Sequence, residues 1–276
     1  MKNIITLLVC TTLFLTACKQ STKQEEKLTT AAPAATKKVE SLIGKPIVPA
    51  DSVTKNFSKF WIYYNDIMLH NDFKAIDTNG KTITRVLLLE KLTSGLYFPL
   101  ALYAANDTPS YKLTLIPKTA DENISAYMQQ FSSQQLEYCK LEGKPVPSFD
   151  FKDLNGNHYT SENIKGKIVL FKCWFISCVA CVKEMPDLNQ IVKKYANRKD
   201  ILFISLATDN KKELQQFLSK TKFDYATVSN QAKYMSDKLH VVVYPTHFII
   251  NKKGELVRML PDVRSVEDAI EKELAK

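Results

Sequence analysis

The sequence predicts an α/β protein in which a mixed sheet with helices on both faces is preceded by a smaller α+β domain. Two observations lead to this fold class. After residue 142, apolar strand-like segments alternate with helical patterns, which is typical of a sheet covered on both faces. Before that, turn signals separate short strands and two longer helical patterns. A chain of 276 residues can bury more than one apolar core.

The chain begins with a secretion signal. A basic start, Met1-Lys2-Asn3, runs into an apolar stretch at residues 4–15. Small residues then precede Cys18, which resembles a bacterial lipoprotein signal, so residues 1–17 are predicted to be cleaved and Cys18 to carry lipid. The alternative is a plain cleaved signal followed by a chance cysteine. We expect a periplasm-facing protein of the bacterial cell envelope, in an oxidising space.

Residues 18–50 are predicted to form a lipidated, flexible tether. Their composition is mainly Lys, Gln, Thr, Ala and Glu, with almost nothing large and apolar before Leu42. No other stretch is apolar enough to span a bilayer, so the lipid on Cys18 is the expected membrane anchor. The net charge of +9 comes from scattered lysines without a basic, aromatic stripe, which argues against a nucleic-acid partner.

Residues 51–141 are predicted to form the small α+β domain. An aromatic run, residues 57–64, is followed by a turn signal at residues 77–80 between two strand-like segments, and Thr84 caps a helix that stops at Gly95. Strands are expected at residues 97–103 and 111–116, and a helix from 122 to about 138. We recognise no catalytic constellation here, and we expect His70 at the surface or at a helix cap.

Residues 142–276 carry the alternating pattern, which begins after the helix-breaking segment at residues 143–147. Strands are expected at residues 149–154, 157–160, 167–175, 201–207, 225–228, 247–251 and 255–260. Helices are expected at residues 178–195, 211–220 and 232–239, with a last one starting near 265.

Three of the six cysteines lie in the segment FKCWFISCVACVKEMP, residues 171–186. Cys10 leaves with the signal and Cys18 is used for the lipid, so the remaining thiols are Cys139, Cys173, Cys178 and Cys181. Cys178 lies where a buried strand ends and a helix begins, and helix N-terminal amides favour a thiolate there. We therefore expect Cys178 to be the nucleophile, and Cys181, one turn inside the helix, to resolve the mixed disulfide.

The segments VLFKCWFISCVACVKEMPDL and VYPTHFIINKKGEL resemble the thioredoxin fold in its membrane-anchored TlpA/ResA-like branch, over residues 143–276. The resemblance implies that Trp174 is the family tryptophan, that Pro186 kinks the active-site helix, and that Pro245 is a cis-proline facing the cysteines. It also implies that the backbone of Tyr244 pairs with a client protein.

By the same resemblance, the protein is a thiol:disulfide oxidoreductase without an organic cofactor. It implies a reductant that a membrane thiol donor recharges and that serves clients such as apocytochromes in cytochrome c biogenesis. Three positions depart from the family pattern: Ser177 replaces an aromatic residue, Val179-Ala180 replaces a dipeptide with proline, and Thr160 replaces a glutamate, with Glu162 out of register. These departures leave the redox potential open.

Lys172 occupies the position at which thioredoxins place a buried aspartate. The lysine either stabilises the Cys181 thiolate by its charge, or packs its stem while its ammonium finds an acceptor or water. Cys173, on the same strand, is expected to be a core residue. Cys139, near the domain boundary, is either a spare thiol or part of a regulatory pairing.

Other chemistries fit the cysteines less well. Cys173, Cys178, Cys181 and His247 have the donor types of a metal site, but a second close pair is missing, so we expect no metal. A peroxidase would need Pro and Thr or Ser where Phe171 and Phe175 stand. A disulfide that is only structural, and a non-catalytic or metal-binding lipoprotein that recognises partners, remain the alternatives.

Overall fold

The computed structural model describes residues 42–106 and 108–276. Residues Leu42–Lys276 form one compact unit. The predicted signal peptide, Cys18 and most of the predicted tether lie outside the described residues. In the part of the chain that is described, no helix has the length and apolar character needed to cross a membrane.

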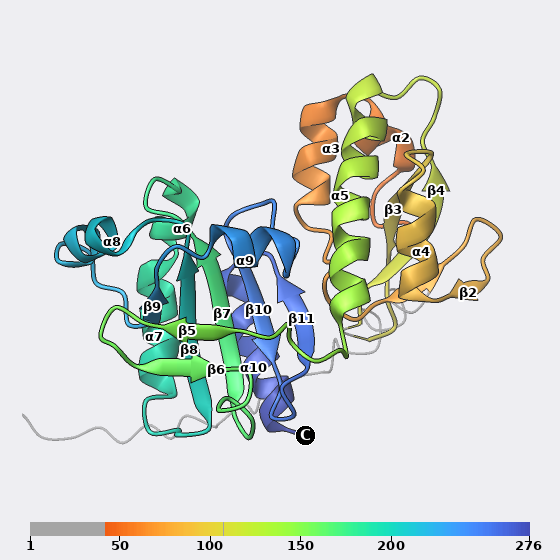
Figure 1. The fold of residues 1–276 in the computed structure, drawn as a ribbon. Coiled ribbons are helices and arrows are strands. Elements are labelled where there is room, and N and C mark those ends of the chain that lie inside the picture. The colour runs from red at the N-terminus through yellow and green to blue at the C-terminus, as the bar shows by residue number, and fades with distance from the viewer. Residues whose placement is uncertain (1–41, 107) are drawn as a thin grey trace, which may run out of the picture. The chain divides into compact units, whose positions relative to one another are not determined.

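The N-terminal lobe, residues 42–141, is built on a four-stranded sheet of order β2-β1-β4-β3 (Figure 1). Its elements are α2 (Ala50–Thr54), α3 (Phe57–Tyr64), β1 (Lys74–Ile76), β2 (Thr82–Ile83), α4 (Arg85–Leu92), β3 (Tyr97–Leu102), β4 (Ser110–Leu115) and α5 (Glu122–Leu141). The predicted cap of α4 is confirmed, because the Thr84 side chain accepts a hydrogen bond from Leu87 N at 3.1 Å. The aromatic run forms α3 and faces the core with Phe60 and Tyr64.

Residues 44–48 already belong to the folded lobe, so the predicted tether, residues 18–50, is too long. Gly44 N donates to Tyr103 O at 2.8 Å and Ile47 N donates to Ala101 O at 3.0 Å, which places this segment along β3. Val48 packs against the apolar core of the lobe. Backbone pairing and this apolar contact fix a segment whose polar surroundings predicted flexible chain.

The thioredoxin-like region, residues 142–276, contains a five-stranded sheet of order β11-β10-β7-β8-β9. Its strands are β7 (Ile168–Trp174), β8 (Ile201–Ala207), β9 (Ala226–Val228), β10 (Thr246–Ile250) and β11 (Leu256–Leu260), and a hairpin of β5 (Asp150–Lys152) and β6 (His158–Thr160) precedes them. The helices are α6 (Val179–Lys183), α7 (Met185–Lys194), α8 (Lys211–Leu218), α9 (Ala232–Asp237) and α10 (Val266–Leu274), with a 3-10 turn at Val263–Ser265. β7, β8 and β9 are parallel, whereas β10 is antiparallel to both of its neighbours.

The central strand β7 is buried along its whole length and separates two apolar layers. Ile168 and Leu170 face the core that contains α7 and α10, whereas Phe171 and Cys173 face the core that contains α9 and the β5–β6 hairpin. Helices therefore cover both faces of a mixed sheet, and the predicted fold class is confirmed. Cys173 is a core residue, as expected.

His70 lies against the thioredoxin-like region and is buried, so the expectation of a surface or capping residue is wrong. Its Nε2 lies 3.1 Å from Ser265 Oγ, and its carbonyl oxygen accepts from Arg258 Nη1 at 2.8 Å. Ser265 is 195 residues and Arg258 is 188 residues away along the chain. Local sequence therefore does not predict the burial of His70.

Candidate active site

Cys178 and Cys181 form a disulfide at the start of α6, with their Cα atoms 5.2 Å apart. Cys178 is the N-cap residue of this helix, and its sulfur accepts a hydrogen bond from Cys181 N at 3.2 Å. Cys178 is 8% exposed and Cys181 is fully buried, while the flanking residues Ser177 and Val179 are exposed. Of the two cysteines, Cys178 is therefore the more accessible to a partner.

An aromatic and aliphatic cluster surrounds the disulfide. Trp174, Met185 and Leu214 are buried in this cluster together with both cysteines. The Trp174 ring packs against Phe217 and Phe223, each at a centroid distance of 5.8 Å. Its buried Nε1 has no hydrogen-bond partner among the described residues. The sequence-predicted tryptophan thus lies directly beside the pair.

The segment before β10 lies against the same cluster. The Tyr244–Pro245 peptide bond is cis, as expected. The Tyr244 ring packs edge-on against Phe175 at a centroid distance of 5.2 Å and contacts the cluster that holds the disulfide. The fold therefore brings Tyr244, Pro245 and the cysteine pair together.

Three ionisable side chains are buried on the disulfide side of the sheet. Lys172 Nζ and His247 Nε2 both bond Glu184 Oε1, the histidine at 3.0 Å. Lys172 on β7 and His247 on β10 are directly paired across the two strands, so their side chains share one face. Lys172 and His247 are fully buried, and Glu184 is 7% exposed. We call these three residues the buried triad.

Burial and pairing act against each other in the buried triad. Burial lowers the pKa of Lys172 and of His247, and Glu184 opposes both shifts. Burial would raise the pKa of Glu184, but the hydrogen bond and charge of His247 and the charge of Lys172 bring that pKa below its usual value. Pairing with His247 and Lys172 therefore favours a carboxylate on Glu184 despite its burial.

The buried triad is connected to the disulfide by two links. Glu184 is the C-cap of α6 and lies three residues after Cys181, a spacing that places both on one side of the helix. Lys172 Nζ also lies 5.9 Å from the centre of the Phe223 ring, which packs against Trp174. Sequence reasoning found Lys172 but missed Glu184 and considered His247 only as a metal ligand. The i, i+3 spacing from Cys181 was an available signal for Glu184.

The four side chains considered as metal ligands do not converge. Cys173 lies on the opposite face of β7 from the buried triad, and Cys178 and Cys181 are bonded to each other. Across residues 42–106 and 108–276, no three His, Cys, Asp or Glu side chains are grouped as a metal site. Glu162 forms a surface ion pair with Lys165 at 2.6 Å.

The other two cysteines of the described chain are unpaired. Cys139 is half-buried on α5, and burial raises the pKa of its thiol. Cys173 is fully buried, and burial also raises the pKa of its thiol. Both thiols are therefore less ionised than an exposed cysteine, which disfavours them as nucleophiles.

Comparison with known proteins finds relatives of the thioredoxin-like region. Residues 143–259 match the AhpC/TSA family. The chain is 29% identical over 114 residues to the thioredoxin-like protein YneN of Bacillus subtilis, covering 41% of this chain and 67% of that one. It is 28% identical over 146 residues to the thiol-disulfide oxidoreductase ResA of Bacillus cereus, covering 52% of this chain and 82% of that one. These matches support a similarity of the thioredoxin-like region to the TlpA/ResA-like family.

The protein is a thioredoxin-like thiol:disulfide oxidoreductase. Among solved structures, it is similar to the thioredoxin domain of a thiol-disulfide oxidoreductase from Bacteroides vulgatus, with 23% identity and a TM-score of 0.43. That likeness covers 48% of this chain and 96% of the solved chain. The matched family region, residues 143–259, contains the disulfide and the buried triad and excludes the N-terminal lobe.

Proposed function

We propose that this oxidoreductase reduces disulfides of client proteins through Cys178 and Cys181. One observation carries the proposal: Cys178 sits at the N-cap of α6, slightly exposed, and is bonded to a fully buried Cys181. The helix N-terminus stabilises a thiolate on Cys178, and burial keeps Cys181 from reacting with outside disulfides.

The proposed reaction proceeds in two exchanges. In the reduced protein, the Cys178 thiolate attacks one sulfur of a client disulfide, forming a mixed disulfide and releasing the other client sulfur as a thiolate. Cys181 then loses its proton and attacks the Cys178 sulfur, which restores the Cys178–Cys181 disulfide and releases the second client thiolate. Two electrons pass to the client, so the pair needs no organic cofactor, and a thiol donor must reduce it again.

The buried triad has a positioning role in this proposal. The Cys181 proton has to leave a fully buried sulfur, and Glu184, at the end of α6, is a buried base bonded to His247. The charge of Lys172 favours a thiolate in the same low-dielectric region. The balance of Lys172 and Glu184 keeps the cluster neutral, which limits the cost of burying it.

Trp174, Tyr244 and Pro245 lie around the cysteine pair, and each has a proposed supporting role in client exchange. Trp174 shields the pair, and Tyr244 with Pro245 forms the side on which the client backbone lies. We further propose that lipid on Cys18 anchors the protein to a membrane of the bacterial cell envelope, facing the periplasm. There a membrane thiol donor recharges it, and its clients include apocytochromes in cytochrome c biogenesis.

The test compares Cys178→Ala with Cys173→Ala in the reduced protein. We expect Cys178→Ala to reduce a protein disulfide only at the uncatalysed rate. Cys173→Ala, which removes a thiol from the opposite face of β7, should keep the wild-type rate at equal folded concentration. Unchanged exchange by Cys178→Ala would refute the catalytic assignment and favour a module that only recognises partners.

A further inference from the structure

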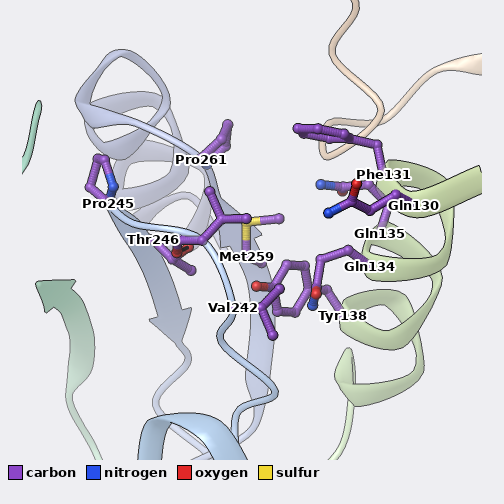
Figure 2. Close-up of a pocket in the computed structure, with 11 residues that line it drawn as sticks. Gln130, Phe131, Gln134, Gln135, Tyr138, Val242, Pro245, Thr246, Met259 and Pro261 are labelled. Carbon is purple, nitrogen blue, oxygen red and sulfur yellow. Dashed lines mark hydrogen bonds between the residues drawn. The ribbon is translucent and has the colours of Figure 1, made fainter. Parts of the chain in front are cut away.

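A groove separates α5 of the N-terminal lobe from the segment that leads into β10. Figure 2 shows Gln130, Phe131 and Gln134 of α5 on one wall, facing Val242 and Pro245 on the other. Tyr138, Thr246 and Met259 lie deeper in the groove. The cavity is about 110 Å³. An apolar cavity of about 150 Å³ holds benzene, so this one suits a single aliphatic side chain.

Both walls of the groove are held in place by contacts outside it. Gln134 Nε2 donates to His240 O at 2.9 Å, which ties α5 to the turn before Val242. The Tyr138 ring packs edge-on against Phe248 of β10 at a centroid distance of 5.8 Å. Below it, Glu142 pairs with Arg85 at 2.6 Å and with Arg258 of β11 at 3.5 Å. The groove is therefore a built feature of the compact unit.

The groove is continuous with the disulfide site. Pro245 lines the groove, and its neighbour Tyr244 contacts the cluster around Cys178 and Cys181. Two valines at this junction are exposed to solvent, Val242 at 67% and Val243 at 48%. Val179, the residue after Cys178, is 81% exposed. Pro245 and Tyr244 thus link the groove to the cluster that holds the disulfide.

The lining is uncharged but offers unused hydrogen-bonding groups. None of the 11 lining residues is ionised at neutral pH. Within the described residues, Gln135 Oε1 and Tyr138 Oη are buried without a hydrogen-bond partner. A buried polar atom without a partner costs free energy, so these two atoms favour a ligand that supplies donors or acceptors. Amide groups of a peptide backbone, alternating with apolar side chains, meet this requirement.

We propose that α5 and the Val242–Val243 segment form a docking groove for an extended, apolar segment of an unfolded client polypeptide. This inference rests on the proposed function, because the docked segment presents its disulfide to Cys178. A folded client keeps such segments buried, whereas an unfolded one exposes backbone amides and apolar side chains together. The N-terminal lobe thereby supplies one wall of the substrate site, although it lies outside the matched family region.

The experiment places one carboxylate on each wall of the full-length protein. Gln130→Glu charges α5, and Val242→Glu charges the opposite segment. Gln129→Glu is the matched control, because Gln129 is exposed on the same helix and does not line the groove. Binding is measured by fluorescence anisotropy of unfolded ribonuclease A with its cysteines blocked. Exchange is measured with scrambled ribonuclease A and, separately, with oxidised glutathione.

Both groove variants should raise Kd for the blocked chain about tenfold, which equals about 1.4 kcal/mol. They should raise KM for scrambled ribonuclease similarly and leave the glutathione rate unchanged, while Gln129→Glu behaves as wild type. If both groove variants bind the blocked chain with the wild-type Kd, the proposed docking groove is refuted. A loss with Val242→Glu alone would overturn the role of α5.

Failure of the proposed function gives a different result. If the wild type binds the blocked chain in the groove but exchanges with neither disulfide, the redox assignment fails. The binding result in that case still supports the groove, because blocked cysteines cannot take part in exchange.

Discussion

The two regions of this oxidoreductase differ in what they bury. The thioredoxin-like region buries Lys172, Glu184 and His247 on the side of its sheet that carries the disulfide. The N-terminal lobe fills its interior with aromatic rings, such as Phe60 stacked on Tyr64. Burying charged side chains costs free energy. In this protein the buried charges lie near the cysteine pair, where the proposed reaction removes a proton from the buried Cys181 thiol. An aromatic core carries no such desolvation cost. In the N-terminal lobe it holds α5 in place, and α5 forms one wall of the groove.

The largest effect on stability is expected at the centre of the buried triad. Glu184→Gln removes the carboxylate that pairs with the Lys172 ammonium and should destabilise the oxidised protein by about 3–5 kcal/mol. Denaturant unfolding measures this difference. The double variant Lys172→Met with Glu184→Gln should recover much of the loss, because no unpaired charge remains. A loss below about 1 kcal/mol in Glu184→Gln would contradict a charged, buried pair.

The next effect tests the one buried histidine of the N-terminal lobe. Burial lowers the pKa of His70 to about 4, although Asp262 opposes the shift and Arg85, Arg258 and Arg264 add to it. The unfolded chain binds the proton near pH 6.5, so His70 stabilises the fold above that pH and the stabilisation is lost as the pH falls toward 4. About 3 kcal/mol is at stake, from about 1.4 kcal/mol per pKa unit.

Unfolding at a series of pH values checks this expectation. His70→Gln should remove the part of the pH dependence between pH 6.5 and 4 that is due to His70. An identical slope in wild type and His70→Gln would show that His70 is protonated without cost, contrary to its burial against Ser265.

The smallest effect concerns a hydroxyl inside the N-terminal lobe. Tyr63 Oη donates to Pro99 O at 2.8 Å and accepts from Ala101 N at 2.7 Å. Tyr63→Phe removes the hydroxyl that bonds Pro99 O and Ala101 N of β3. The variant should lose about 1–3 kcal/mol of unfolding free energy. Tyr97→Phe is the control, because the Tyr97 hydroxyl has no hydrogen bond to another described residue. Equal stability of both variants would contradict the structural role of Tyr63.

Local pattern predicted most of the fold. Strand and helix periodicity located β7, β8 and α8 to within two residues, and the position of Cys178 at a helix start followed from the junction of two patterns. These features depend on neighbours along the chain. The cis bond at Pro245 and the position of Lys172 were predicted differently, from the resemblance to a known family and not from local pattern.

What the sequence did not predict depends on distant partners. His247 joins Lys172 through antiparallel register between β10 and β7, and local sequence does not encode that register. His70 is buried by residues of β11 and the following turn. The α5 wall of the groove likewise exists only once α5 packs beside β10. Pairing across the fold, and not residue type, decides these positions.

The central claim is that Cys178 and Cys181 form a reversible redox couple. The full-length protein would be equilibrated in graded thiol and disulfide buffers, and free thiols would be located by alkylation and mass at each poise. We predict one two-electron step confined to Cys178 and Cys181, at a potential more negative than about −240 mV, the range of a glutathione pool. No reversible step at this pair, or a step that involves Cys139 or Cys173, would contradict the account.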